Sequence, residues 1–329
     1  MTTAPRRLAV GVTPMENRAD VVLHLAGRAE ALGYESFSVA EGWGHDAAVL
    51  LATIAARTDR IRLATGVLNV WGRSPAGIAM LAGSLDEASG GRFALGLGAG
   101  SPQLAEGLHG RRFEAPVARL GAVTREVRSL LAGGRATPPL TGGRRPLRLA
   151  VPPHPGVPVH LAALGPRSVR LAGEVADAWC PFFLPRSGLA EGLKQLQEGA
   201  IAADRPLPAV RPGLPVAVAA DPAVAEAVAA WWVVTYLTGM GPLYAETLRR
   251  LGLGAAVDAV VAANPTPRSP VLPPGARVLV DEVLVAGDAA AARSVLDEWT
   301  AAGADVPGIV LPPGRPVEEL EHVLEVLRP

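Results

Sequence analysis

Short apolar runs alternate with longer amphipathic stretches along almost the whole chain. The short runs predict strands at 8–13, 36–40, 61–66, 92–97, 159–163, 178–180, 215–219, 282–286 and 308–311. The longer stretches predict helices at 19–32, 46–57, 75–89, 116–132, 167–176, 189–203, 221–237, 289–302 and 317–327. Such alternation is typical of parallel strands joined by crossover helices. Because the count is close to eight βα units, we expect a (β/α)8 TIM barrel rather than an open sheet.

Two stretches fall outside this rhythm. Residues 133–158 are rich in Gly and Pro and predict a long excursion with a hairpin. Residues 238–280 predict an added helical segment followed by a Pro-rich loop. Insertions in barrel enzymes tend to cover the active-site face, so we expect both to lie over the carboxyl ends of the strands. Neither stretch separates two self-sufficient patterns, and we therefore expect a single domain over residues 1–329.

The composition indicates a soluble protein of the cytoplasm. Hydrophobic residues make up 49% of the 329 residues, which is ample for a large core. The formal net charge is +0, so no overall field attracts nucleic acid or anionic lipid. We find neither a signal-peptide pattern nor an apolar run of the roughly 20 residues that a membrane span needs. Cys180 is the only cysteine and the six histidines lack ligand spacing, so we expect neither a disulfide framework nor a metal site.

A glycine-rich stretch, GLGAGSP at 96–102, directly follows a predicted strand. A dinucleotide fingerprint needs GxGxxG opening straight into a helix, but here the sixth position is Ser101 and an irregular stretch follows. Two interpretations remain. The glycines either line a strand end without a ligand, or they let a planar ring approach the backbone at the carboxyl end of the strand.

Two further motifs follow predicted strands and carry polar groups. LGPRS at 164–168 opens a helix, and the backbone from Gly165 to Ser168 offers N–H groups and a positive dipole end that suit a phosphate, with Arg167 as an added cation. EGWGHD at 41–46 gathers a carboxylate, an indole and an imidazole in a loop freed by glycines. Within it, Glu41 and His45 are candidate proton donors, whereas Asp46 is expected to cap the next helix.

Several sequence motifs in this chain resemble those of a known protein family. Residues 38–110 contain R-T-x-R-I-x-L, R-S-P-x-x-x-A-M and L-D-E-x-S-G-G-R-F-x-L-G-L-G, and further matches lie at 162–179 and 301–307. The chain resembles the luciferase-like flavin and deazaflavin oxidoreductases. The resemblance is strongest to the branch that uses coenzyme F420 and includes methylenetetrahydromethanopterin reductase. It covers nearly the whole sequence.

The resemblance implies a homodimeric barrel whose third strand carries a bulge under a tricyclic ring, with a non-proline cis peptide between Gly66 and Val67. The implied cofactor contacts are Gly66, Val67 and Asn69 on strand three, Ala99, Gly100 and Ser101 after strand four, and Ala162, Ala163, Gly165 and Pro166 at the phosphate, with Arg167 beside them. Relatives that oxidise sugar phosphates carry Asp-His after strand two and a Glu after the strand-four glycines. Here Glu41-Gly42 and Ser101 occupy the matching positions, so we do not expect that substrate class.

The resemblance therefore predicts hydride transfer between C5 of a deazaflavin, coenzyme F420, and a small organic substrate with an activated C=C or C=N bond. One alternative is an FMN-dependent monooxygenase, and another is a barrel that binds flavin or deazaflavin without turnover. Arg73, Arg111, Arg112 and Arg167 are candidates to hold the anionic lactyl-glutamate tail that F420 has and FMN lacks. These charges would favour F420 over FMN, and salt would weaken that preference.

Overall fold

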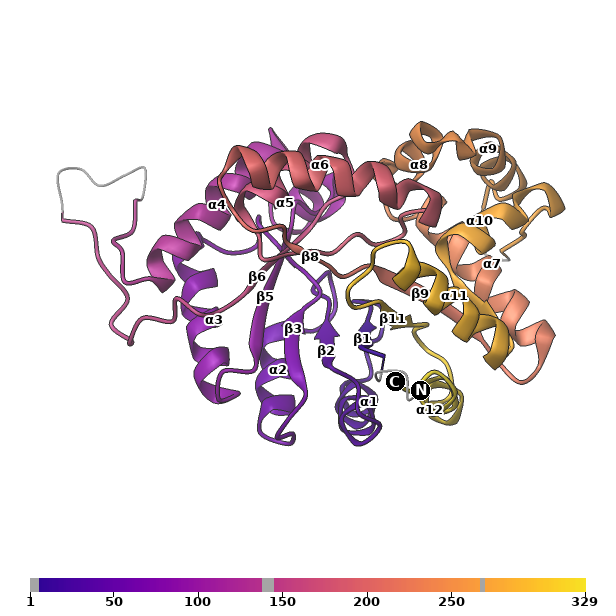
Figure 1. The fold of residues 1–329 in the computed structure, drawn as a ribbon, viewed down its shortest axis with the longest axis horizontal. Coiled ribbons are helices and arrows are strands. Elements are labelled where there is room, and N and C mark those ends of the chain that lie inside the picture. The colour runs from indigo at the N-terminus through magenta and orange to yellow at the C-terminus, as the bar shows by residue number, and fades with distance from the viewer. Residues whose placement is uncertain (1–5, 138–144, 267–269) are drawn as a thin grey trace.

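A computed structural model describes residues 6–137, 145–266 and 270–329. Its centre is a curled parallel sheet with helices around the outside (Figure 1). The strands are β1 Ala9–Val12, β2 Ser36–Val39, β3 Arg62–Thr65, β4 Leu68–Asn69, β5 Phe93–Gly98, β6 Val159–Ala162, β7 Ala178–Trp179, β8 Ala209–Val210, β9 Gly213–Val218, β10 Val285–Gly287 and β11 Gly308–Leu311. The α-helices are α1 Ala19–Ala31, α2 Ala47–Ala55, α3 Pro75–Ala88, α4 Pro116–Leu131, α5 Pro166–Val175, α6 Leu189–Ala202, α7 Pro222–Thr238, α8 Pro242–Leu248, α9 Gly254–Ala263, α10 Arg277–Val283, α11 Ala289–Ala301 and α12 Val317–Val326.

The strand order confirms an α/β fold of the TIM-barrel type. The hydrogen-bonded path runs β10-β9-β11-β1-β2-β3-β5-β6-β7-β8, with β4 added beside β5, and the pairings are parallel. β8 and β9 follow one another in the chain with Arg211 and Pro212 between them. Gly213 pairs with Gly308 on one side and forms a bridge to Phe182 on the other. The sheet therefore curls back toward its own beginning.

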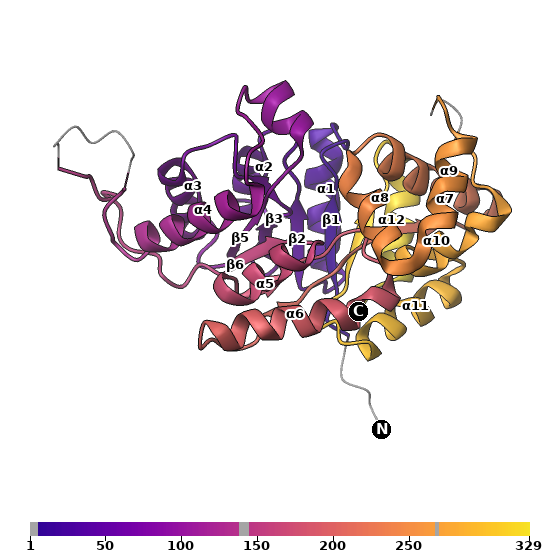
Figure 2. The same ribbon diagram turned by 90° about the horizontal axis from the view of Figure 1, so that it is seen from above.

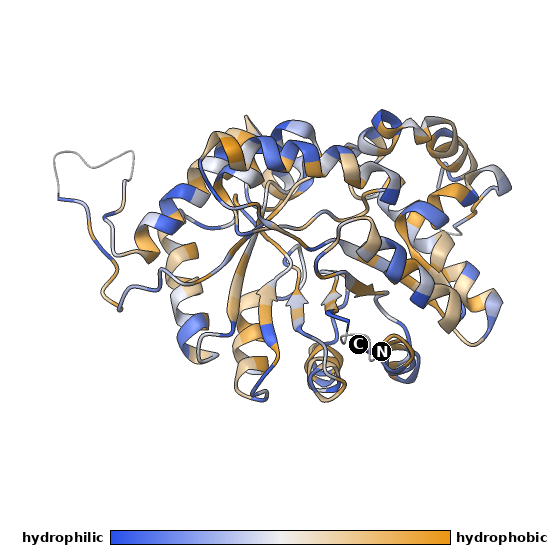
Figure 3. Cartoon of the chain, in the orientation of Figure 1, coloured by the Kyte–Doolittle hydropathy of each residue, from blue (hydrophilic) through white to orange (hydrophobic). Residues whose placement is uncertain are grey.

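Apolar side chains from the sheet and the surrounding helices form the main core, and a second cluster lies among α7, α8, α9 and α10. Trp232, Val257 and Leu279 are fully buried in that second cluster. Seen from above, these helices gather at one side of the sheet (Figure 2). The helices alternate hydrophobic and hydrophilic residues (Figure 3), as expected for elements with one face on a core.

Helices α5 and α6 approach each other closely because glycines face each other across the contact. A Cβ at Gly173 would lie 2.1 Å from the carbonyl oxygen of Leu196, and one at Gly199 would lie 2.0 Å from that of Arg170. Only residues without a side chain fit such a crossing. The contact fixes the position of α5, whose first residues matter for the site described below.

The excursion at 133–158 does not cover the carboxyl ends of the strands, contrary to expectation. The ring of His154 contacts Asp86 of α3 (Nδ1 to Oδ2, 2.9 Å). The backbone N–H of His154 donates to the carbonyl oxygen of Leu131 at the end of α4. The connection leads from a helix to a strand, and such connections emerge at the opposite, amino-terminal edge of a parallel sheet. The limbs of the predicted hairpin meet through a bond from the Ala136 N–H to the Leu147 carbonyl. No strand is assigned in the described parts of this segment, and residues 138–144 lie outside them.

The predicted strand at 282–286 was misplaced. The chain is helical to Val283 in α10 and extended only from Val285 to Gly287. A short run of valines is compatible with a buried helix or a buried strand, so periodicity does not separate the two. The added helical segment predicted within 238–280 is present as α8 and α9, and α10 follows the Pro-rich stretch.

Among the residues described, no single helix is long and apolar enough to cross a membrane. The bent pair Pro222–Thr238 and Pro242–Ala263 meets the length and composition requirement only when its two parts, 105° apart, are taken together.

Candidate active site

A cavity of about 1300 Å³ opens at the carboxyl ends of the strands and continues down the inside of the sheet. Small-molecule sites usually have about 300–1000 Å³, so this cavity has room for two ligands side by side. It is lined by all but one of the residues expected to form the site: Glu41, Gly66, Val67, Asn69, Ala99, Gly100, Ser101, Ala162, Ala163, Gly165, Pro166, Arg167 and Ser168.

His45 is the exception. Its side chain is exposed, it does not line the cavity, and its Nε2 donates to the carbonyl oxygen of Asn17 at 2.9 Å. The adjacent Trp43, by contrast, lines the cavity although its side chain is largely exposed.

The third strand is interrupted where it borders the cavity. β3 ends at Thr65, the peptide bond between Gly66 and Val67 is cis, and β4 resumes at Leu68 beside β5. The carbonyl oxygen of Val67 accepts a hydrogen bond from the N–H of Glu41 at 3.2 Å. The predicted interruption and the predicted cis bond are both confirmed.

The glycines of β5 accommodate this interruption. A Cβ at Gly96 would lie 2.0 Å from the carbonyl oxygen of Thr65, and one at Gly98 would lie 2.7 Å from the side chain of Val67. Packing between strands therefore explains Gly96 without any ligand, as in the first of the two interpretations of the glycine-rich stretch. Gly100 differs, since it has a φ of +66° and lines the cavity. The following residues form a π-helix, Gln103–Leu108, rather than the helix of a dinucleotide fingerprint.

The amino-terminal end of α5 faces the cavity. No side chain caps this helix, and the hydroxyl and N–H of Ser168 both donate to the carbonyl oxygen of Gly165. Pro166 has no N–H, so the N–H groups that remain at this end of the described helix are those of Gly165 and Arg167. Together with the positive end of the helix dipole they form a site for an anion.

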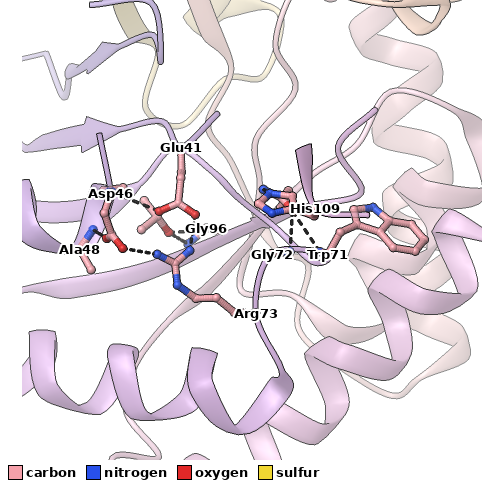
Figure 4. A network of polar contacts seen from close by, with 11 residues as sticks. Glu41, Asp46, Ala48, Trp71, Gly72, Arg73, Gly96 and His109 are labelled. Atoms are coloured by element: carbon pink, nitrogen blue, oxygen red, sulfur yellow. Dashed lines mark hydrogen bonds and ion pairs between the residues drawn. The ribbon is translucent and has the colours of Figure 1, made fainter. Parts of the chain in front are cut away.

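Glu41 belongs to an ion-pair network at the cavity wall (Figure 4). One of its carboxylate oxygens pairs with Arg73, and the other accepts from the N–H of Ala47 at 3.1 Å. Arg73 also contacts Asp46 at 2.6 Å, and the hydrogen bond to Glu41 raises the pKa of its guanidinium. Asp46 accepts from the N–H of Ala48, which confirms it as the cap of α2. Glu41 thus joins the loop after β2 to the segment before α3.

Asn69 is held in place by contacts with Trp71, Gly72 and His109, which are labelled in Figure 4. Its Oδ1 accepts from the N–H groups of Trp71 and Gly72, and its Nδ2 lies 3.3 Å from Nε2 of His109. His109 follows the π-helix and was not predicted as part of the site. A lone histidine in an irregular segment carries no spacing that could have revealed it.

Of the four arginines considered for the acidic tail, only Arg167 lines the cavity. Arg73 is already paired with two carboxylates. Arg112 is highly exposed and lies 3.6 Å from Glu114. Any charge-based preference for F420 would therefore rest mainly on Arg167 and the end of α5.

The lower part of the cavity holds polar groups that the sequence did not single out. Arg211 donates to Glu35 at 2.9 Å and to the hydroxyl of Ser36 at 3.0 Å. His160 and Cys180 project from neighbouring strands into the same space. Burial lowers the pKa of His160 to about 4, assisted by Arg211, and burial raises the pKa of the Cys180 thiol to about 11.

We expect His160 to make the protein less stable in mild acid. Between about pH 6.5 and pH 4 the unfolded chain binds a proton at this residue and the folded chain does not, so the free energy of unfolding falls as the pH falls. The loss is up to about 3 kcal/mol, from the size of the pKa shift. Arg211, Arg62, Glu35 and Asp177 are the charged groups that act on this imidazole.

Denaturant titrations of the protein and of His160→Asn at several pH values test this expectation. The variant should show a flatter pH dependence over this interval. Equal slopes for the two proteins would contradict it.

The fold and the cavity define an α/β protein of the TIM-barrel type with a deep ligand site at the carboxyl ends of its strands. The family model described as luciferase-like monooxygenase matches residues 1–306, and the chain belongs to this family.

One relative, of Mycobacterium tuberculosis, is named "Putative coenzyme F420-dependent oxidoreductase" and is 34% identical over 322 residues, covering 89% of this chain and 90% of the relative. The solved F420-dependent tetrahydromethanopterin reductase of Methanopyrus kandleri superposes with a TM-score of 0.79 at 20% identity and covers 97% of both chains. The oxygenating constituent of 3,6-diketocamphane monooxygenase of Pseudomonas putida, solved with FMN, gives 0.70 at 19% identity and covers 99% of this chain and 97% of its own. At these identities the two structures bear on the fold alone.

Proposed function

We propose that the protein is a coenzyme F420-dependent oxidoreductase that transfers a hydride between C5 of the deazaflavin and a small organic substrate, reducing an activated C=C or C=N bond. The observation that carries the proposal is that three features line one cavity. They are the break between β3 and β4, the loop after β5, and the amino-terminal end of α5, which no side chain caps. The relative of M. tuberculosis named for F420 supports the choice of cofactor.

The residues present fit a deazaflavin. Ala99 and Gly100 line one wall of the cavity and place no bulky side chain there, which suits a planar ring. The N–H groups of Gly165 and Arg167 suit the phosphate, and the Arg167 side chain suits an acidic tail. The bound cofactor would supply or accept the hydride, while the chain binds, orients and excludes water.

We assign Glu41 a positioning role. Both of its carboxylate oxygens already accept hydrogen bonds, and its own N–H holds the carbonyl of Val67 at the cavity wall. It therefore orients the loop after β2 against the interrupted strand. His45 lies outside the cavity lining, so we assign it no part in proton transfer.

The second candidate is an FMN-dependent monooxygenase, favoured by the description of the family model. A barrel that binds the cofactor without turnover is the third. We also propose a single domain and a cytoplasmic location, from the pattern and composition of the sequence, and a homodimer, from the family resemblance. Light scattering of the purified protein tests the dimer.

Reaction with oxygen separates the two enzymatic candidates. The protein is loaded with reduced F420 or with reduced FMN and exposed to air, then to cyclohexenone as a probe acceptor. We expect bound reduced F420 to persist in air and to be oxidised when the acceptor is added. Rapid oxygen consumption by the FMN-loaded protein in the presence of an acceptor, without oxidation of F420, would instead favour the monooxygenase.

A further inference from the structure

Two tyrosines line the cavity next to the loop after β5. Tyr236 comes from the last turn of α7 and Tyr244 from the first turn of α8. Gly241, between these helices, lies against that loop, since a Cβ there would be 3.3 Å from Gln103 and 3.8 Å from Ser101. The tyrosines therefore border the part of the cavity expected to hold the reacting ring.

Aromatic packing fixes both side chains. The rings of Tyr236 and Tyr244 meet edge to face with centroids 5.1 Å apart, and Tyr236 stacks on Phe183 at 5.1 Å. Phe182 also lines the cavity and lies 5.1 Å from Tyr236 and 6.3 Å from Tyr244. Such packing leaves each phenol little freedom to turn away from the cavity.

Neither phenol has a hydrogen-bond partner in the part of the chain that the structure describes. Tyr236 is only 3% exposed, and Tyr244 is partly buried. Burial raises the pKa of Tyr236 well above its usual value and that of Tyr244 to about 12, so both remain protonated donors. Tyr34, the one remaining tyrosine of the chain, shows the contrast, because its hydroxyl donates to the Leu324 carbonyl at 2.9 Å. Buried phenols normally find a partner, and an unpaired one facing a cavity points to a ligand.

We propose that Tyr236 and Tyr244 are a pair of hydrogen-bond donors for the carbonyl oxygen of an uncharged, largely apolar substrate whose reducible C=C bond is conjugated with that carbonyl. This assignment rests on the proposed function and names its substrate class. The surrounding Phe182 and Met240 are apolar, and the charged neighbour on this wall is the carboxylate of Glu246. Among the described lining residues of α7, α8 and the turn between them, none is a cation that would favour an anionic substrate.

The pair serves the reduction directly. A hydride adds to the β-carbon of the conjugated carbonyl compound, the C=C electron pair shifts, and negative charge develops on the oxygen. A phenol gives its proton to that oxygen and forms an enol, which tautomerises to the saturated carbonyl compound, and the phenolate regains a proton from water. A bound deazaflavin would supply the hydride and, with it, the two electrons of the reduction. Preorganised donors at a developing oxyanion are among the largest contributions to catalysis.

The test uses Tyr236→Phe, Tyr244→Phe and the double variant, which keep the aromatic packing, with Tyr34→Phe as the matched control. Carbonyl-labelled ¹³C-cyclohexenone is added to the protein with oxidised F420, and to the protein alone. We expect a downfield shift of the carbonyl resonance with the wild type and the control, a smaller shift with each single variant, and none with the double variant.

In reductions of cyclohexenone, each single variant should lose about 10- to 100-fold in kcat/KM, with F420 affinity unchanged. An unchanged carbonyl resonance with the wild type, or equal shifts and rates in the Phe variants, would overturn the assignment. Failure of the wild type to bind F420 would overturn the proposed function instead, and the arm without cofactor would still test the donor pair.

Discussion

Replacing Gly165 with valine is expected to weaken F420 binding by about 10- to 100-fold, or about 1.4–2.8 kcal/mol, while the fold is kept. The backbone of Gly165 has φ −80° and ψ 152°, which any residue adopts, and a Cβ there would meet only the hydroxyl of Ser168 at 3.8 Å. The two methyl groups of valine would therefore enter the cavity at the end of α5. They would exclude an anion from the N–H groups of Gly165 and Arg167.

Fluorescence titration of F420 against Gly165→Val and Gly165→Ala measures this effect. The alanine variant should lose much less, because its single methyl group has room. Thermal unfolding of both variants controls for the fold. Wild-type affinity in the valine variant would mean that the phosphate binds elsewhere in the cavity.

Replacing Gly96 with alanine is expected to cost about 3 kcal/mol or more in the free energy of unfolding and to damage the site as well. The new Cβ would lie 2.0 Å from the Thr65 carbonyl oxygen and 3.0 Å from a methyl group of Val67. Backbone must move to relieve the first contact, and that backbone forms the interrupted strand at the cavity wall. Stability and F420 affinity should therefore fall together.

Gly27→Ala is the matched control for this substitution. Gly27 lies in α1, and a Cβ there would have no neighbour within 4 Å. Alanine in a helix is more favourable than glycine by about 0.5–1 kcal/mol, so this variant should be slightly more stable. Denaturant unfolding compares the two. A Gly96→Ala protein as stable as the wild type would show that the strands are not packed as described.

Periodicity was sufficient to predict most of the elements that build the barrel wall, although the strand at 282–286 was misplaced. The helix predicted at 75–89 is α3, Pro75–Ala88, and the strand predicted at 308–311 is β11. Periodicity did not reveal the strand after β7, where Arg211 and Pro212 divide one extended segment into β8 and β9. A proline and a charged residue conceal a strand from a pattern based on apolar runs.

Residue motifs predicted the cavity lining at the ends of β3, β5 and β6 better than the lining that comes from α7 and α8. Gly66, Gly100 and Gly165 could be assigned because glycines after strands have a definite backbone role. Tyr236 and Tyr244 could not, because they reach the cavity only through the turn between α7 and α8 and its packing on the loop after β5. The position of the excursion at 133–158 could not be predicted from its composition, because composition does not show at which edge of the sheet the segment emerges.

The cofactor assignment is tested most directly by paired titrations of the purified protein with F420, carrying its glutamate tail, and with FMN, at low and at high salt. We predict tighter binding of F420, with an advantage that shrinks as salt screens Arg167 and the end of α5. Tighter binding of FMN at low salt would contradict the account.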